Sequence, residues 1–361
     1  MTSGDRAHEA AVQARIETFR RRRPRLVDEH ITTAHGAGGK ASAALIDNVF
    51  REAFDNPVLG LMADAGVVDA LGGRLAVTTD SYVVTPRRFT GGSIGDLAVN
   101  GTVNDLAMVG ARPTWLTAAF VLEEGLPIDE LRGYVADMAR AAVAAGVVII
   151  AGDTKVVARG GADGLYITTA GVGVVPDGRR LGADSVRAGD RVLVSGPIGD
   201  HGIAVLLARG DLALQADVRS DTAALHGLVE ALLIAAPATR WLRDPTRGGV
   251  ASAVNELAVA AAVGVALDEA AIPVRPAVTA ACELLGIDPL YVANEGRLVA
   301  VVPAGEVDAA LGSLRAHPCG REAAVIGKIV ADPPGMVTLA TAFGGTRIVD
   351  LLVGDPLPRI C

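Results

Sequence analysis

The chain has 361 residues, of which 50% are hydrophobic and 20% are charged, and its 41 acidic and 33 basic side chains give a formal net charge of −8. This composition is typical of a globular protein, and the length exceeds what one hydrophobic core usually supports, so we expect two domains. An acidic chain with 3% aromatic residues offers neither a basic surface for phosphate backbones nor rings for stacked bases. Nucleic acid is therefore not an expected ligand.

The N-terminus lacks the apolar stretch of a secretory signal, and the longest apolar runs, Ala141–Gly152 and Leu257–Leu267, are too short to cross a bilayer. The three cysteines, Cys282, Cys319 and Cys361, are too few and too widely spaced for a disulfide framework or a zinc knuckle. We expect a cytoplasmic protein without a membrane partner.

The first half of the chain alternates strand and helix patterns after a charged, Arg-rich extension at residues 1–29, which is expected to be flexible. Apolar and β-branched runs predict strands, and apolar residues at helical spacing predict helices. The predicted strands are 75–84, 115–122, 147–150 and 165–175, and the predicted helices are 43–54, 94–109 and 131–145. Residues 30–180 are thus predicted to form an N-terminal α/β domain.

A polar, Gly-containing stretch at 178–190 marks the expected domain boundary. The following residues, 181–350, repeat the alternation and predict a C-terminal α/β domain. Its predicted strands are 191–195 and 299–302, and its predicted helices are 203–208, 221–235 and 250–263. The last residues, 351–361, contain two prolines and are expected to be a mobile tail that buries little.

The segment HGAGGK places three glycines and a lysine immediately before a predicted helix. Exposed backbone amides, a helix N-terminus and an ammonium group suit a phosphate group. The residues concerned are His35, Gly36, Gly38, Gly39 and Lys40. The spacing matches neither a Walker A loop nor a dinucleotide fingerprint, so a plain Gly-rich turn is an equal alternative.

Four aspartates, Asp64, Asp80, Asp105 and Asp244, lie in apolar or Gly-rich surroundings. Buried carboxylates need cations or strong donors, and Mg²⁺ bound to a polyphosphate needs oxygen ligands of this kind. Each alone is more typical of a cap or a turn, but four beside a Gly-Lys loop favour a metal–phosphate site.

Two further segments carry polar residues beside predicted strands. Asp153, Thr154 and Lys155 follow the strand at 147–150, and the sequence Asn294-Glu295-Gly296 precedes the strand at 299–302. Lys155 and Glu295 are candidates for proton transfer or amide positioning, and an ordinary ion pair between domains is the alternative.

Cys361 is the final residue and follows a proline-containing tail. A thiol on a mobile tail suits a covalent carrier that is loaded at one site and processed at another. An incidental exposed cysteine is the alternative, and Cys282 and Cys319 are interpreted as structural.

Eight motifs in order resemble the HypE family of hydrogenase maturation proteins, within the aminoimidazole ribonucleotide synthetase superfamily. They are HGAGGK, TTDS, GDLAVNGTVNDLAMVGARP, GDTKVV, SGPIGDHG, DPTRGGVA, NEGRLV and the terminal PRIC. The resemblance extends from about residue 30 to Cys361. The terminal cysteine motif distinguishes this family from selenophosphate synthetase and thiamine-monophosphate kinase.

The resemblance implies an ATP-dependent carbamoyl dehydratase. In such proteins the carbamoyltransferase HypF loads a carbamoyl group onto the terminal cysteine, here Cys361, and ATP-dependent dehydration leaves a thiocyanate. The cyanide passes to iron held by HypC and HypD and becomes a ligand of the nickel–iron centre of hydrogenase. The implied fold is a two-domain α/β (α+β) chain, which forms a homodimer through a β-barrel shared by the N-terminal strands.

The resemblance also implies a site. Mg²⁺ would bind Asp64, Asp80, Asp105 and Asp244, and Lys155 and Glu295 would stand near the entering tail as candidate base and orienting group. The implied ATP contacts are His35, Gly36, Gly38, Gly39, Lys40, Asp80, Asn104, Asp105, Asp153, Thr154 and Arg247. Three alternatives are a small-molecule kinase or synthetase of the same superfamily, a nucleotide-binding scaffold without catalysis, and a redox sensor that uses Cys361.

Overall fold

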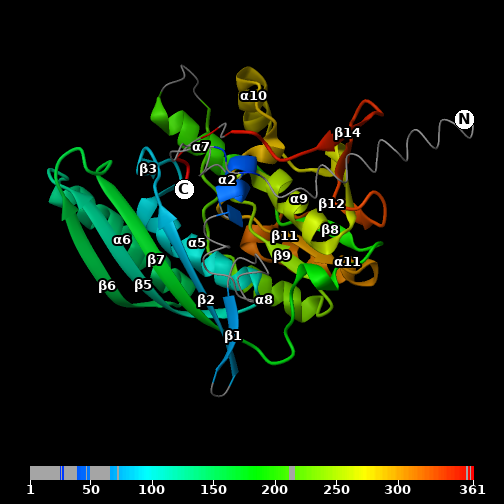
Figure 1. The fold of residues 1–361 in the computed structure, drawn as a ribbon, viewed down its shortest axis with the longest axis horizontal. Coiled ribbons are helices and arrows are strands. Elements are labelled where there is room, and N and C mark those ends of the chain that lie inside the picture. The colour runs from blue at the N-terminus through cyan, green and yellow to red at the C-terminus, as the bar shows by residue number, and fades with distance from the viewer. Residues whose placement is uncertain are drawn as a thin grey trace, which may run out of the picture.

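The computed structural model describes residues 25, 27, 39–45, 47–48, 66–70, 73–210, 216–354, 357 and 359–361. Two lobes lie side by side, one built on a five-stranded sheet and the other on a seven-stranded sheet (Figure 1). A short helix, α2 (Lys40–Leu45), precedes the first lobe, and a small two-stranded sheet pairs β3 (Arg88–Phe89) with β4 (Gly92–Ser93). No helix among the described residues is long and apolar enough to cross a membrane.

The first lobe has the strand order β1-β2-β7-β5-β6. Neighbouring strands are antiparallel except β5 and β6, which run parallel and are connected through α6. The elements are β1 (Gly66–Ala70), β2 (Gly73–Tyr82), α5 (Ile94–Met108), β5 (Arg112–Glu123), α6 (Ile128–Ala145), β6 (Val148–Val157) and β7 (Leu165–Val175). The strands predicted at 75–84, 115–122 and 165–175 and the helices predicted at 94–109 and 131–145 are confirmed apart from their ends.

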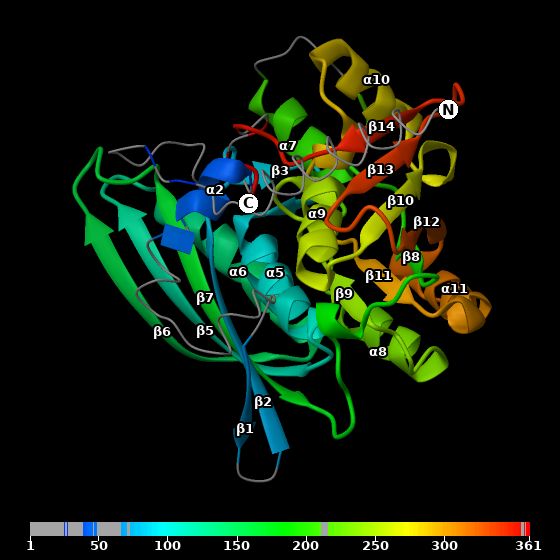
Figure 2. The same cartoon turned by 45° about the vertical axis from the view of Figure 1, so that its right-hand side comes forward.

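Helix α5 is the central element of the molecule. It lies between the five-stranded sheet and the second lobe (Figure 2). Ser93 caps its N-terminus by accepting a hydrogen bond of 3.2 Å from the amide of Gly95. All of its residues are buried except Asp96 and Asp105. Both lobes therefore depend on the position of this helix.

The second lobe has the strand order β14-β13-β10-β12-β8-β11-β9, and β10 and β13 are its parallel neighbours. Helix α9 packs on one face of the sheet, and α8 and α11 pack on the other. The strands are β8 (Arg191–Val194), β9 (Trp241–Arg243), β10 (Gly264–Asp268), β11 (Val299–Val302), β12 (Ala324–Val330), β13 (Val337–Ala340) and β14 (Thr346–Val349); the helices are α7 (Asp200–Arg209), α8 (His226–Ala235), α9 (Gly249–Ala261), α10 (Pro276–Leu285) and α11 (Val307–Ala316). The α/β fold class is confirmed.

Among the described residues, helices cover only one face of the five-stranded sheet. Along β2 and β7, residues alternate between buried and more exposed positions, as expected for a sheet with helices on one side. We call the uncovered side the outer sheet face. It carries apolar side chains such as Val77, Trp115 and Val174, which are 45%, 47% and 44% exposed.

Three local expectations are wrong. The strand predicted at 147–150 continues to Val157, so Asp153 and Lys155 lie within β6 and not after its end. The helix predicted at 221–235 begins at His226, because the preceding residues form a connecting segment that bonds to α5. The expectation that the tail buries little is also wrong, because Leu357 and Ile360 are 3% and 6% exposed and pack into a hydrophobic core to which both lobes contribute.

Gly101 tests the packing of α5. A β-carbon at this position would lie 2.3 Å from the hydroxyl oxygen of Tyr82, which is itself 1% exposed. Gly101→Ala should therefore lower the free energy of unfolding by roughly 1–3 kcal/mol despite its better helix propensity. Gly312→Ala is the matched control, because open space surrounds this glycine of α11, and it should be neutral or slightly stabilising. Chemical denaturation of both variants checks this, and equal effects would contradict it.

Candidate active site

Acidic side chains from both lobes meet at the junction between them. Asp80 lies on β2 and Asp105 on α5, whereas Asp244 follows β9 and Glu295 precedes β11. Asp244 and Glu295 are 6% and 2% exposed. Sequence analysis predicted all four as site residues, and the structure brings them to one region.

Glu295 has an unusual environment. Its Oε1 atom is buried and has no hydrogen-bond partner within the described structure. Burial raises the pKa of Glu295 well above its usual range, and the negative charges of Asp244, Asp221 and Asp80 raise it further. The positive charge of Arg247 lowers the pKa of Glu295. The side chain therefore holds its proton to a higher pH than an ordinary glutamate does.

Asp80 and Tyr82 share this environment. Burial raises the pKa of Asp80, although the amide of Ser81 donates to its carboxylate at 2.7 Å and Arg247 lowers the pKa. Burial and the charges of Asp80 and Asp105 raise the pKa of Tyr82. The site is thus a negatively charged region that suits a cation or a ligand carrying one.

Asn104 connects the two lobes. Its amide nitrogen donates to the carbonyl oxygens of Ala223 and Glu295, at 3.0 and 3.2 Å, and its oxygen accepts from the amide of Leu225 at 2.7 Å. The side chain is 1% exposed. In the structure, the hydrogen bonds of Asn104 position the backbone beside Glu295, and its contact with ATP stays a prediction.

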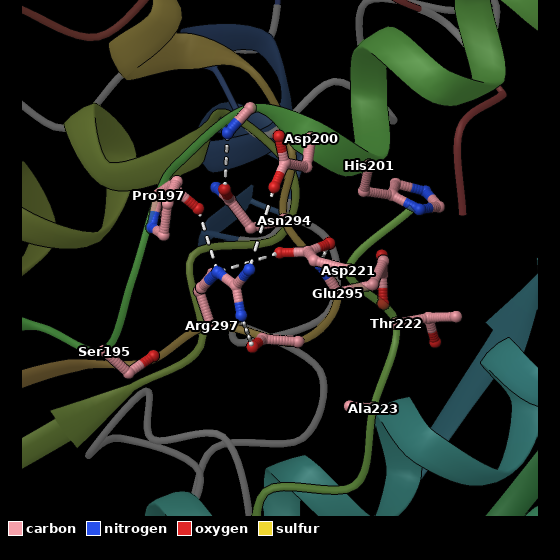
Figure 3. A network of polar contacts seen from close by, with 12 residues as sticks. Ser195, Pro197, Asp200, His201, Asp221, Thr222, Ala223, Asn294, Glu295 and Arg297 are labelled. Carbon is pink, nitrogen blue, oxygen red and sulfur yellow. Dashed lines mark hydrogen bonds and ion pairs between the residues drawn. The ribbon is translucent and has the colours of Figure 1, made fainter. Parts of the chain in front are cut away.

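A buried ion-pair network adjoins Glu295, and sequence analysis did not find it (Figure 3). Arg297 lies 3.6 Å from Asp221 and 3.7 Å from Asp200, and its Nε also donates to the carbonyl oxygen of Pro197 at 2.8 Å. Asp221 in turn accepts from the amide of Glu295 at 3.0 Å. Only the NEGRLV motif pointed to Arg297, and nothing in the sequence around Asp221 indicated its burial.

The carboxylates fit a hard divalent cation by chemistry, because Asp80, Asp105 and Asp244 are oxygen donors whose mutual repulsion a cation would relieve. Among the described residues, however, no three acidic, histidine or cysteine side chains are grouped closely enough to hold a metal ion. Asp64, the fourth predicted ligand, lies outside the described residues. The metal set stays a prediction.

The glycine-rich loop is described only at its end. Lys40 begins α2, and its Nζ lies 3.7 Å from the carboxylate of Asp350, with both side chains about half exposed. A β-carbon on Gly39 would lie 2.3 Å from the carbonyl oxygen of Leu352, so this position requires glycine. His35, Gly36 and Gly38 lie outside the described residues.

Lys155 does not reach Glu295 in this chain. It lies on β6, an edge strand, and its Nζ is 3.2 Å from Asp153; the two side chains are 72% and 62% exposed. Lys155 pairs in register with Val121, on the outer sheet face, whereas Asp80 lies on the helix-covered face. The expected proximity of Lys155 and Glu295 is therefore wrong within one chain. The side chain of Thr154 is not described.

The C-terminal residues lie against the end of β2. The amides of Val83 and Thr85 donate to carbonyl oxygens of Cys361 and Arg359, both at 3.1 Å. This pairing places the terminal cysteine directly after the strand that carries Asp80. Cys282, in contrast, is buried in α10, which raises the pKa of its thiol to about 11 and agrees with a structural role.

Comparison with known proteins defines the family. Models of AIR synthase related proteins match the chain with their N-terminal domain at residues 62–175 and their C-terminal domain at 187–339. Carbamoyl dehydratase HypE of Rhodobacter capsulatus is 56% identical over 340 residues, which cover 93% of this chain and 99% of that protein.

Two solved structures agree with this result. A HypE–HypF complex has a chain that is 46% identical with a TM-score of 0.81, covering 86% of this chain and 100% of its own. HypE in complex with ATP is 46% identical to this chain with a TM-score of 0.78, and the match covers 92% of this chain and 100% of that one. Fold and site thus define an AIR synthase related protein. Within that class, the chain belongs to the HypE family of carbamoyl dehydratases, and the resemblance seen in its motifs is confirmed.

The raised pKa of Glu295 predicts a pH-dependent stability. An unfolded glutamate titrates near ~4.3, so the wild type loses stability as the pH rises above this value and through the folded pKa. Glu295→Gln removes this loss, and the variant should gain stability relative to the wild type between about pH 5 and about pH 8. Denaturation at both pH values measures the difference. Glu283→Gln, at an exposed position of α10, is the control, and a pH-independent difference for Glu295→Gln would contradict the argument.

Proposed function

We propose that this chain is an ATP-dependent carbamoyl dehydratase that converts a carbamoyl group on Cys361 into a thiocyanate and supplies cyanide ligands for nickel–iron hydrogenase. The observation that carries the proposal is the position of the terminal cysteine: its backbone pairs with the residue directly after β2, the strand that leads from Asp80. Named relatives that are carbamoyl dehydratases, and one solved with ATP, support it.

The reaction needs both ATP and a base. The carbamoyl oxygen attacks the γ-phosphorus of ATP, ADP leaves, and nitrogen gives up one proton. The carbon–oxygen bond then breaks, phosphate leaves with that oxygen, and nitrogen gives up its second proton to form the carbon–nitrogen triple bond. Phosphorylation thus turns a poor leaving group into a good one.

Glu295 is the proposed proton acceptor within the chain. Its raised pKa makes the carboxylate a stronger base than that of an ordinary glutamate, which favours removal of a proton from nitrogen. The carboxylate of Asp221 accepts a hydrogen bond from the amide of Glu295, and the side chain of Asn104 donates one to the carbonyl oxygen of Glu295. The backbone of Glu295 is therefore held from two sides.

Mg²⁺ is proposed to bind with the nucleotide at Asp80, Asp105 and Asp244, with Asp64 as a fourth ligand. It would neutralise triphosphate charge, and phosphate oxygens would complete its coordination. The remaining proposed ATP contacts are His35, Gly36, Gly38, Gly39, Lys40, Asn104, Asp153, Thr154 and Arg247. Arg247 is exposed, yet its charge lowers the pKa of both Asp80 and Glu295. This combination suits a residue at the solvent-exposed edge of the site.

The outer sheet face is proposed to form the homodimer and its shared barrel. Apolar side chains on this face, including Val77 and Trp115, would be buried there. Lys155 and Asp153 lie on the same face, so a role for Lys155 in proton transfer requires a site that two chains form together.

HypF and the HypC–HypD complex are the proposed partners. A relative of this chain has been solved in a HypE–HypF complex. The division into a flexible extension at 1–29, domains at 30–180 and 181–350, and a tail at 351–361 is part of the same proposal. A tail that moves between HypF and the site described here would connect loading with dehydration.

Mass spectrometry of the intact protein tests the function. With ATP, Mg²⁺, carbamoyl phosphate and HypF, the wild type should gain one carbamoyl group, and this adduct should then lose one water in an ATP-dependent step. Cys361→Ala should show neither change, and Cys319→Ala should behave as the wild type. ATP turnover on a free substrate without an adduct would instead support a small-molecule kinase.

Mixed dimers test the role of Lys155. If two chains form one site, Lys155→Met and Glu295→Gln homodimers should each dehydrate the loaded tail slowly. A heterodimer of the two variants keeps one site in which both Lys155 and Glu295 are intact, so it should recover part of the wild-type rate. Single-turnover dehydration of co-expressed, differently tagged chains measures this. Activity of the Lys155→Met homodimer at the wild-type rate would exclude Lys155 from the reaction.

A further inference from the structure

The last three residues of the chain have every backbone carbonyl engaged. The oxygen of Arg359 accepts from the amide of Thr85 at 3.1 Å and from Arg209 at 3.0 Å, and an oxygen of Cys361 accepts from the amide of Val83 at 3.1 Å. The oxygen of Ile360 points to the other side and accepts from the ring of His201 at 2.5 Å. The tail is thus held by its backbone from two directions.

His201 is the buried side-chain donor in this arrangement. It lies on the first turn of α7, is 0% exposed, and packs edge-on against Phe89 with ring centroids 5.4 Å apart. A carbonyl oxygen only accepts, so Nε2 carries the hydrogen that bonds to Ile360. Nδ1 of the neutral ring therefore accepts from the hydroxyl of Ser220, at 2.8 Å.

The chain keeps the ring in this neutral form. Burial lowers the pKa of His201, which outweighs the opposing effects of Asp221 and of the bond to Ile360. Ser220 is fixed in turn, because its amide donates to Thr90 at 2.8 Å and its Oγ accepts from the amide of Thr222 at 3.2 Å. The orientation of the imidazole is therefore set by groups that do not belong to the tail.

The support of His201 continues to the acidic site. The segment Ser220–Leu225 carries Ser220, which contacts the imidazole, and Asp221, which accepts the amide of Glu295. Asn100 and Asn104 of α5 bind the same segment through Thr222 and Ala223. Figure 3 shows His201, Asp221 and Glu295 on adjoining elements, with the tail running beside the imidazole.

We propose that His201 is the positioning residue that holds the C-terminal peptide in place, through its hydrogen bond to Ile360, while the group on Cys361 is processed. This inference rests on the proposed function and assigns a role in delivery of the tail, separate from proton transfer. Bonding to a backbone carbonyl leaves the side chain of the terminal residue out of the contact. The same contact therefore suits the free thiol and its loaded forms.

Two variants separate the contacts of the ring. Asn at this position is too short to reach Ile360 but keeps an oxygen where Nδ1 accepts from Ser220. Gln extends its amide toward the position of Nε2 and can donate to Ile360. His201→Asn should thus release the tail, and His201→Gln should largely retain it. His226→Asn, on α8, is the control for loss of a partly buried histidine away from the tail.

Two measurements on the full-length protein report release of the tail and its delivery to the site. Alkylation of Cys361 by iodoacetamide, located by mass spectrometry, reports release of the tail, and buried Cys282 of the same molecule reports unfolding. Single-turnover dehydration of protein already carbamoylated by HypF reports delivery. His201→Asn should raise alkylation of Cys361 and slow dehydration by roughly three- to tenfold each, the range for one hydrogen bond, with loading by HypF unchanged. His201→Gln should lie near the wild type.

The outcomes distinguish the inference from the proposed function. Wild-type rates of alkylation and dehydration in His201→Asn would overturn the inference, and so would equal losses in the Asn and Gln variants. Faster alkylation of Cys282 as well as Cys361 in both variants would assign the histidine to folding and would also overturn it. If the wild-type adduct never loses water with ATP, the proposed function fails, and the alkylation rates alone then decide whether His201 holds the tail.

Discussion

The burial of Glu295 among other carboxylates is the constraint on which the site depends. Desolvation and three neighbouring aspartates all disfavour its ionised form, and Oε1 has no hydrogen-bond partner in the described structure. The carboxyl group avoids the cost of a buried charge by keeping its proton, and the backbone around it is fixed by two other side chains. Asn104 and Asp221 supply this by bonding to the backbone of Glu295 from two different elements, and Arg297 partly neutralises the acids behind it.

Because of this constraint, the acidic site forms only when both lobes are in place. Asp80, Asn104 and Asp105 belong to the first lobe, and Asp244, Arg247 and Glu295 belong to the second. Helix α5 carries residues of the site on one side and packs into the core that contains α8 on the other. A change in the position of α5 would therefore alter both the acidic site and the distance between the lobes.

The sequence predicted elements with strong periodicity and missed those set by distant contacts. Strand 299–302 is correct to the residue because four consecutive apolar residues are buried on both faces of the sheet. The strand containing Lys155 was cut short, since polar residues in an edge strand resemble a loop. The aspartates were found from their apolar or Gly-rich surroundings, and Glu295 was found from its position just before a predicted strand. Asp221 and His201 were missed as site residues because their burial depends on elements far away in the sequence.

The tail shows why composition alone misjudges a proline-containing segment. Two prolines exclude a helix or an inner strand, but they do not prevent pairing along one edge, where only carbonyl oxygens are needed. Arg359 bonds to Thr85 and Cys361 bonds to Val83, whereas the intervening Ile360 bonds to His201. The apolar side chains of Leu357 and Ile360 add burial to these bonds. The tail is thus docked by hydrogen bonds to its backbone carbonyl oxygens together with a few apolar contacts, and none of these hydrogen bonds involves the thiol of Cys361.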